Sequence, residues 1–151
     1  MATRGIKSKY VVKNRHKYIG KNIDSIILRS SWESLYIRHL DYSKSILEFS
    51  SECVIIPYIC PTDGKRHKYY MDFFVKSIDA EGNISRSLVE IKPNKERSRP
   101  RNNKNKKRHL TETMTYVKNQ AKWAAAELYA HTRGWNFYVL DEYSLGIKKK
   151  K

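Results

Sequence analysis

The run Ser87-Leu88-Val89-Glu90-Ile91-Lys92-Pro93 decides how the rest of the chain is interpreted. It is short, rich in apolar and β-branched residues and closed by proline, which is typical of a β-strand. Side chains two positions apart in a strand lie on the same face of its sheet. We therefore predict a strand on which Glu90 and Lys92 point the same way.

A second apolar run, Tyr69-Tyr70-Met71-Asp72-Phe73-Phe74-Val75, also has the composition of a strand and contains one acid. Turn-forming residues at 79–83 (Asp-Ala-Glu-Gly-Asn) can join the two runs as a hairpin, which would bring Asp72 beside Glu90. Each charge alone is compatible with the solvent face of a half-buried strand. Together, two carboxylates and one ammonium group suit a divalent metal ion that activates water against a phosphodiester.

The length of 151 residues favours one domain with its own core. The sequence contains no run of eighteen apolar residues, so no transmembrane helix is expected. The basic N-terminus lacks the apolar stretch of a secretory signal. The two cysteines, Cys53 and Cys60, are expected to be free thiols. Together with His67 and His109 they lack the paired spacing of a zinc motif, so zinc is not expected.

Positive charge is concentrated in three segments. The net charge is +16, and residues 1–22, 93–108 and 148–151 hold seven, eight and four of the 31 Lys and Arg residues. Basic segments on a nearly neutral body indicate binding to a polyanion, most often nucleic acid. A solvated basic surface or an acidic protein partner would give the same pattern. We expect a basic N-terminal arm at 1–22, one domain at 23–147 with a basic flexible loop at 93–108, and a lysine tail at 148–151.

The remaining elements follow from capping and periodicity. Ser30 and Glu33 form a capping box that starts a helix. A strand is predicted over residues 53–59, with an edge or bulge at Pro57, and the turn Pro61-Thr62-Asp63-Gly64 predicts that it forms a hairpin with the run that holds Asp72. A long helix is predicted over 109–133 and ends at Gly134. Residues 135–140 read as the last strand. The order α-β-β-β-α-β predicts an α/β fold with a mixed sheet flanked by helices.

This order resembles the PD-(D/E)xK endonuclease superfamily, in which Asp and Glu-x-Lys come from consecutive core strands and a Glu from the first helix. TnsA-type endonucleases share the Asp-Phe strand and a Glu-Ile-Lys-Pro run. The head-completion nucleases of T-even-like tailed bacteriophages are more similar still, in size and in an ordered series of runs. Here the series is Arg29-Ser30-Ser31-Trp32-Glu33, Ile56-Pro57-Tyr58, Tyr69-Tyr70-Met71-Asp72 and Glu90-Ile91-Lys92-Pro93-Asn94-Lys95. One departure is Met71, where the superfamily usually has proline.

The resemblance implies the role of each site residue. Asp72, Glu90 and the carbonyl of Ile91 would bind Mg²⁺ or Mn²⁺, with Glu33 as a ligand from the helix. Lys92 would orient or deprotonate the attacking water. Glu52 is a further acid near the strand, for which a structural role is the simpler interpretation. The residues expected to bind DNA phosphates are Lys95, Arg97, Arg99, Arg101, Lys104, Lys106, Lys107 and Arg108.

The resemblance also implies a biological setting. It predicts a Mg²⁺-dependent deoxyribonuclease, an endonuclease that could also act as an exonuclease. Because no base-reading motif is visible in the sequence, we expect selection of DNA structure rather than sequence. It would act on double-stranded or branched DNA in phage head completion, DNA packaging and head–tail joining, with portal or head proteins as partners. The site of action would be the cytoplasm of the infected bacterium or the virion. A junction-resolving or transposase-type nuclease, or a non-catalytic DNA-binding assembly protein, would fit the same features.

Overall fold

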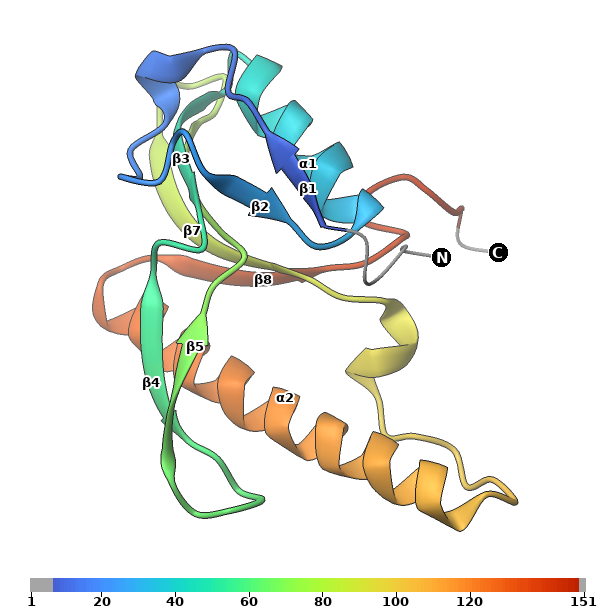
Figure 1. Cartoon of the computed structure of the whole chain (residues 1–151). Coiled ribbons are helices and arrows are strands. Elements are labelled where there is room, and N and C mark those ends of the chain that lie inside the picture. The colour runs from blue at the N-terminus through green and yellow to red at the C-terminus, as the bar shows by residue number, and fades with distance from the viewer. Residues whose placement is uncertain (1–6, 150–151) are drawn as a thin grey trace.

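The computed structural model describes residues 7–149, and this part of the chain builds a central sheet with a helix on each face and a hairpin beside it (Figure 1). The elements in chain order are β1 (Ser8–Tyr10), η1 (Arg15–Lys17), β2 (Ile26–Leu28), α1 (Ser31–Tyr42), β3 (Ile46–Ser51), β4 (Ile55–Ile59), β5 (Arg66–Tyr70), β6 (Phe73–Ile78), β7 (Ile84–Ile91), η2 (Asn94–Arg97), α2 (Lys106–Thr132) and β8 (Asn136–Leu140).

The central sheet has four strands in the order β3-β6-β7-β8. The β3–β6 and β6–β7 pairs are antiparallel, whereas β7–β8 is parallel because α2 carries the chain across one face between them. The expected hairpin turn between β6 and β7 is present, with Gly82 N donating to Asp79 O at 3.1 Å. The series α1-β3-β6-β7-α2-β8 confirms the predicted α/β class and its α-β-β-β-α-β core.

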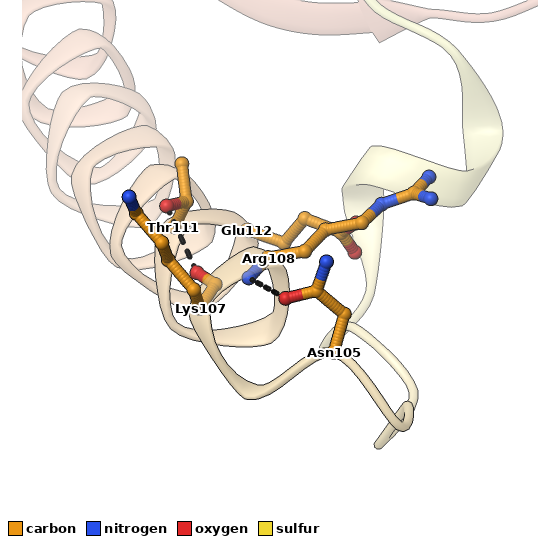
Figure 2. A pocket seen from close by; sticks show the side chains of 5 residues that line it. All are labelled: Asn105, Lys107, Arg108, Thr111 and Glu112. Carbon is orange, nitrogen blue, oxygen red and sulfur yellow. Dashed lines mark hydrogen bonds and ion pairs between the residues drawn. The ribbon is translucent and has the colours of Figure 1, made fainter.

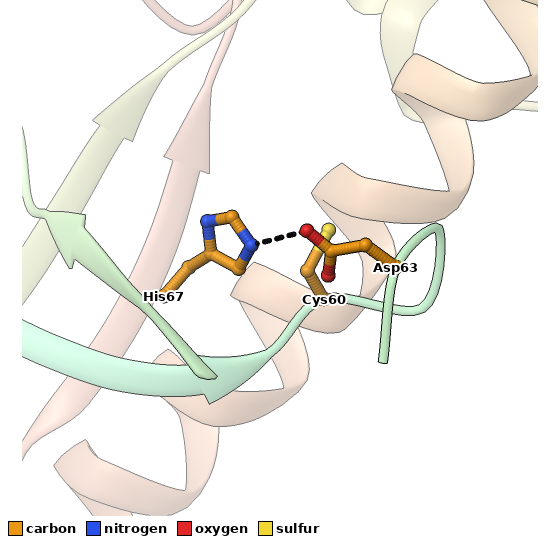
Figure 3. A group of neighbouring side chains, drawn as sticks. All are labelled: Cys60, Asp63 and His67. Atoms are coloured by element: carbon orange, nitrogen blue, oxygen red, sulfur yellow. Dashed lines mark hydrogen bonds and ion pairs between the residues drawn. The ribbon is translucent and has the colours of Figure 1, made fainter. Parts of the chain in front are cut away.

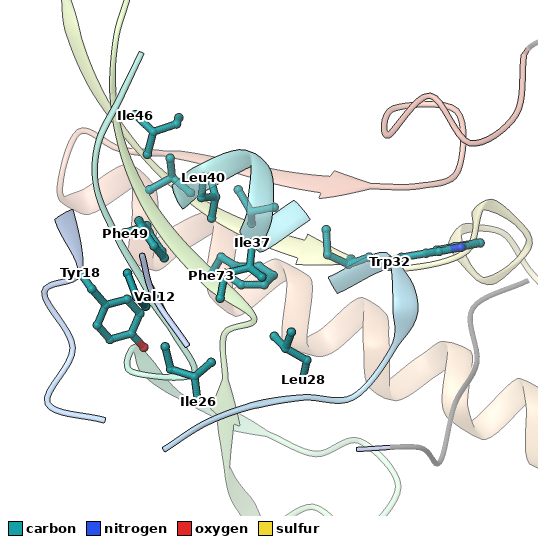
Figure 4. Packing of buried hydrophobic residues seen from close by; sticks show 13 residues of the cluster. Val12, Tyr18, Ile26, Leu28, Trp32, Ile37, Leu40, Ile46, Phe49 and Phe73 are labelled. Atoms are coloured by element: carbon teal, nitrogen blue, oxygen red, sulfur yellow. The ribbon is translucent and has the colours of Figure 1, made fainter. Parts of the chain in front are cut away.

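Side chains along β6 and β7 point alternately to the two faces of the sheet, so one part of the core packs against α1 and the other against α2. Phe73, Val75, Val89 and Ile91 pack with buried residues of α1, as Figure 4 shows in part. Phe74 and Leu88 point to the other face and pack with Ala126 and Ala130 of α2. Glu90 has the same parity as Leu88 and therefore lies on the α2 side. Both faces of the sheet are covered, so a charged residue in β7 is unusual and calls for a partner.

The first core strand was assigned wrongly from the sequence. Residues 53–59, the first strand of the predicted core series, contribute β4 to the predicted hairpin with β5, but this hairpin stands apart from the central sheet. The edge position of the central sheet, next to β6, belongs to β3 instead. Its Ser50 and Ser51 are buried, but two serines after Phe49 are not typical of a core strand, so the sequence contains no clear signal there. Pro57 in β4 has no backbone N–H, which suits a strand of a two-stranded ribbon better than a central strand.

The N-terminal segment, expected as a basic arm, is described from residue 7 onward. β1 pairs with β2, and the buried Lys17 donates from Nζ to three carbonyls at the end of α1, those of Leu40, Asp41 and Ser43, at 2.6, 2.8 and 2.9 Å. The carboxylate of Asp41 accepts in turn from Tyr10, Lys13 N and Asn14 N. These bonds fasten the segment to α1. Residues 1–6, part of the arm, lie outside the described residues, as do 150 and 151 of the lysine tail.

The long helix α2 starts at Lys106, three residues earlier than predicted, because the side chain of Asn105 accepts from Arg108 N at 3.1 Å and caps it. It ends where expected, since Gly134 adopts a φ of +72°. Its N-terminal half projects beyond the sheet (Figure 1), which leaves Leu110 and Met114 exposed. Within residues 7–149 none of the helices combines the length and the apolar composition that crossing a membrane requires.

Candidate active site

Asp72 sits at a break between two strands rather than inside one. The apolar run predicted as a single strand is divided into β5, which ends at Tyr70, and β6, which starts at Phe73. Oδ2 of Asp72 accepts a 2.8 Å hydrogen bond from Ile91 N, which fixes the carboxylate against the end of β7. The bend therefore aims Asp72 at the strand that carries Glu90, as the sequence predicted.

Glu90 is 6% exposed, and its two carboxylate oxygens face different polar partners. Its Oε2 accepts a 2.7 Å hydrogen bond from the hydroxyl of Tyr69, and its Oε1 lies 3.8 Å from Nζ of Lys92. Glu90 and Lys92 thus lie on one face, as the strand periodicity requires. The role of Tyr69 was missed, because from the sequence it reads as an ordinary strand tyrosine.

Glu33 belongs to the first turn of α1, and the predicted capping box forms in part: Ser30 is the N-cap, but the side chain of Glu33 accepts from Arg29 N, one residue before the cap. The N–H of Glu33 donates to Oγ of Ser30 at 3.2 Å, while its Oε2 accepts from Arg29 N at 2.6 Å. The Glu33 carboxylate is also close enough to Asp72 to raise the pKa of that residue. One oxygen of Glu33 is therefore used by the helix start, and the other is available to the site.

Glu52 lies beside this cluster and is held in an unusual backbone conformation. It has a φ of +55°, which few residues other than glycine adopt, and its N–H donates to Asp72 O at 3.2 Å. Its Oε1 lies 2.8 Å from Nε of Arg29. Arg29 was quoted only as part of a motif, and the structure brings its guanidinium to the rim of the acidic cluster.

The carboxylates of the cluster are all biased toward the protonated form. Burial raises the pKa of Asp72 well above its usual value, and the charges of Glu90 and Glu33 raise it further. Burial raises the pKa of Glu90 as well, against the opposing effects of Lys92 and the Tyr69 hydrogen bond. Burial likewise raises the pKa of Glu33, with Glu52 adding to the shift. Closely spaced acids of this kind, one buried and two half-buried, favour a bound cation that restores their ionised forms.

A second lysine, Lys122, reaches the site from α2. Its Nζ lies 5.5 Å from the centre of the Tyr69 ring and 5.9 Å from that of Tyr58. Burial lowers the pKa of Lys122, although the charge of Glu90 opposes the shift. The sequence signal was a single lysine within the Ala-rich stretch 121–126 that faces the sheet, and it was not given a role.

The donor set fits a hard divalent cation. Asp72, Glu90 and Glu33 offer carboxylate oxygens at the end of the sheet, and the Ile91 carbonyl follows Glu90 directly. Oxygen ligands with a high carboxylate content are the preference of Mg²⁺ and Mn²⁺, whereas a zinc site would draw on His or Cys. The predicted ligands are thus compatible with Mg²⁺ in chemistry, and the charges of Glu90 and Glu33 both act on Asp72.

The basic segment 93–108 is partly committed to contacts within the protein. Arg97 pairs at 2.9 Å with the buried Asp141, Arg108 with Glu112 at 2.8 Å, and Arg99 lies 5.9 Å from the Tyr116 ring centre. An open depression of about 390 Å³ lies at the start of α2 (Figure 2). The exposed basic residues of the segment that have no such pairing among the described contacts are Lys95, Arg101, Lys104, Lys106 and Lys107.

Two comparisons place these features among known proteins. The family model for the N-terminal domain of TnsA-like endonucleases matches residues 43–142, a span that contains Asp72, Glu90 and Lys92. The chain belongs to the TnsA-like nucleases. It is similar to the head completion nuclease of enterobacteria phage T4, with 37% identity over 139 residues, 89% of each protein. The resemblance to the PD-(D/E)xK superfamily is therefore confirmed, and this TnsA-like nuclease has the fold and the Asp/Glu-x-Lys series of that superfamily.

Proposed function

We propose that this nuclease is a Mg²⁺- or Mn²⁺-dependent DNA endonuclease whose site is formed by Glu33, Asp72, Glu90 and Lys92. The observation that carries the proposal is the convergence of Asp72, from the bend between β5 and β6, on the end of β7 that carries Glu90, with Lys92 3.8 Å from Glu90 on the same face. A binding protein has no need of buried acids whose mutual repulsion costs stability. A nuclease needs them to hold its metal.

Each residue has a distinct task. When bound, the metal supplies Lewis-acid chemistry and a template for phosphate and water. Asp72 and Glu90 hold it, the Ile91 carbonyl and Glu33 complete its protein ligands, and Ile91 N keeps Asp72 oriented. Lys92 orients or deprotonates the water and balances the charge that develops on the phosphate.

The substrate is DNA, bound mainly through its backbone. Lys95, Arg101, Lys104, Lys106 and Lys107 supply phosphate contacts from the segment that links β7 to α2, beside the catalytic strand. Arg97, Arg99 and Arg108 support that segment while keeping part of their charge at the surface. Because the segment carries no recognisable base-reading motif, recognition of the DNA backbone and shape is favoured over recognition of sequence.

We place the activity in phage head completion, DNA packaging and head–tail joining, because the T4 relative is named for head completion. In that role the protein acts in the cytoplasm of the infected bacterium or within the virion, on double-stranded or branched DNA, and contacts portal or head proteins. Exonuclease action and a junction-resolving or transposase-type role are the alternatives.

The test is cleavage of linear, closed-circular and branched DNA by the purified chain, with Mg²⁺, with Mn²⁺ and with EDTA. The proposal expects metal-dependent cutting that includes circular DNA, because a closed circle offers no end to an exonuclease. Cutting of linear DNA alone would assign the exonuclease alternative. Salt-sensitive binding without cleavage on every substrate and metal would contradict the proposal and leave a DNA-binding assembly protein.

A further inference from the structure

Three side chains of metal-ligand type converge at the turn of the β4–β5 hairpin (Figure 3). Cys60 directly follows β4, Asp63 lies in the turn and His67 is the second residue of β5. One ligand atom from each lies within 4.8 Å of the others. The cluster is separate from the nuclease site, whose ligands come from β7, the β5–β6 bend and α1.

The backbone of the turn fixes these positions. Cys60 N donates to Lys65 O and Gly64 N to Cys60 O, both at 2.8 Å, and Lys65 N donates to Oδ1 of Asp63 at 2.9 Å. Gly64 has a φ of +70°, a backbone conformation that glycine adopts without the steric cost of a Cβ atom, so the residue suits this tight turn. The ligand groups therefore converge on a preformed loop, and their side chains need little rearrangement to share one ion.

The spacing suits a zinc-class ion. Bonds of about 2.0–2.3 Å to N, O and S place neighbouring donors about 3.3–3.7 Å apart in a tetrahedral site. The ligand atoms of this cluster lie within 4.8 Å, and the 2.8 Å contact between Nε2 of His67 and Oδ2 of Asp63 would open by about half an ångström. Thiolate and imidazole ligands select zinc over magnesium.

The exposure of the three side chains and the charge of the bound site are both compatible with a zinc ion. The side chains of His67 and Asp63 are 43% and 40% exposed, so a water molecule can reach the fourth position, while Cys60 is buried beneath them. The thiol proton leaves to solvent on binding, and the thiolate and the carboxylate then balance the charge of the ion. Lys118 of α2 lies near the cluster. Because the ion, the thiolate and the carboxylate sum to zero charge, binding of the ion adds no net repulsion toward the ammonium group of Lys118.

We propose that Cys60, Asp63 and His67 bind one Zn²⁺ ion that fastens the tip of the β4–β5 hairpin. The set differs from the zinc candidates of the sequence, because Asp63 joins it and neither Cys53 nor His109 does. A two-stranded hairpin is only marginally stable by itself, so a metal clip at its tip strengthens an element that otherwise depends on packing against α2. Strand β5 also carries Tyr69, the partner of Glu90, toward the nuclease site.

The test is titration of the full, reduced and metal-free chain with Co²⁺, followed by displacement with Zn²⁺. The proposal expects one equivalent of Co²⁺ to give the near-ultraviolet charge-transfer band of a thiolate ligand and tetrahedral visible bands, both removed by Zn²⁺. Equimolar Zn²⁺ should also raise the melting temperature of the chain.

Matched variants separate this site from other metal binding. Cys60→Ser should abolish the charge-transfer band, whereas Cys53→Ser, at the exposed second cysteine, should retain it. His67→Asn, at a half-exposed residue whose replacement leaves the core intact, should weaken Co²⁺ binding at least about tenfold. Absence of the band in the native chain, or its loss in Cys53→Ser with retention in Cys60→Ser, would overturn the proposal.

Discussion

The hydroxyl of Tyr69 donates a 2.7 Å hydrogen bond to Oε2 of Glu90, and this bond connects the β4–β5 hairpin to the strand that carries the acid of the Glu-x-Lys series. The bond favours the ionised form of Glu90, which burial disfavours. It also leaves one carboxylate oxygen, Oε1, on the side of Lys92. Tyr69 is therefore placed to orient a metal ligand without touching the metal itself.

Tyr69→Phe should lower the apparent affinity for Mg²⁺ about 10- to 100-fold, because Glu90 loses the group that orients it. Cleavage rates measured against Mg²⁺ concentration would show this as a shift of the midpoint, with partial recovery at high Mg²⁺. Tyr70→Phe is the matched control, since Tyr70 is 50% exposed and no hydrogen bond of its hydroxyl is found among the described contacts. Equal midpoints for Tyr69→Phe and the native chain would contradict the role given to Tyr69.

Asp72→Asn should stabilise the metal-free chain at neutral pH. Burial and the neighbouring acids raise the pKa of Asp72, so the folded state holds a proton that the unfolded state releases above about pH 4. The free energy of unfolding of the native chain in EDTA therefore falls as pH rises above that value. Asparagine does not titrate, so the variant lacks the part of this fall that comes from Asp72.

Urea unfolding in EDTA between pH 4 and pH 8 measures the effect. The difference between Asp72→Asn and the native chain should be small near pH 4 and grow toward neutral pH. Asp24→Asn is the control, at a carboxylate whose side chain is 81% exposed. A variant that is less stable than the native chain at pH 7 would show that Asp72 is not under electrostatic strain.

Asp141 should contribute stability with the opposite pH dependence. Although burial alone would raise its pKa, hydrogen bonds from Ser144, Asn94 and Arg97 hold the pKa of Asp141 below its usual value. That contribution is complete above about pH 4 and is lost as pH falls through the folded-state value. Asp141→Asn should therefore cost about 1–3 kcal/mol at pH 7, with the difference shrinking in acid. Hydrogen exchange should show faster opening of residues 94–97, and an unchanged free energy of unfolding at pH 7 would contradict this.

Lys17→Met should destabilise the chain by about 2–4 kcal/mol, because three carbonyls at the end of α1 lose their donor. Urea unfolding monitored by tryptophan fluorescence measures the loss. Lys21→Met, at an exposed lysine of the same segment, should change stability by less than about 0.5 kcal/mol. Equal effects of the two substitutions would show that residues 7–22 behave as an arm rather than as part of the domain.

Replacing Lys95, Arg101, Lys104 and Lys107 by alanine should weaken DNA binding and reduce its salt dependence. Each phosphate that the variant no longer neutralises should lower the slope of log K against log salt by about 0.9. Binding in Ca²⁺ at several salt concentrations measures this slope. Alanine at Lys44 and Arg86, exposed residues outside the basic segment, should leave it unchanged. An unchanged slope in the fourfold variant would place the DNA elsewhere on the surface.

The sequence was most informative where local rules act. Strand periodicity places Glu90 and Lys92 on one face, Ser30 caps the helix that contains Glu33, and Gly134 ends the long helix. These features depend on neighbours in the chain, so composition and spacing are enough to predict them.

The errors and omissions are tertiary. β3 was missed because its buried Ser50 and Ser51 read as a loop, and only pairing with β6 makes them part of a core strand. Tyr69 and Lys122 reach Glu90 from a hairpin and a helix that are distant in sequence. Asp72 was predicted inside a strand, whereas it occupies a bend that only the change of partner between β5 and β6 explains.

The most direct test of the central claim compares Lys92→Ala with Lys76→Ala for DNA cleavage in Mg²⁺ and for DNA binding in Ca²⁺. The two lysines have similar exposure, 24% and 21%, and each lies near one glutamate, but Lys76 pairs with Glu48 on β3. We predict that Lys92→Ala loses at least about a hundredfold in cleavage rate with binding retained, while Lys76→Ala keeps both. Undiminished cleavage by Lys92→Ala would contradict the assignment of the active site.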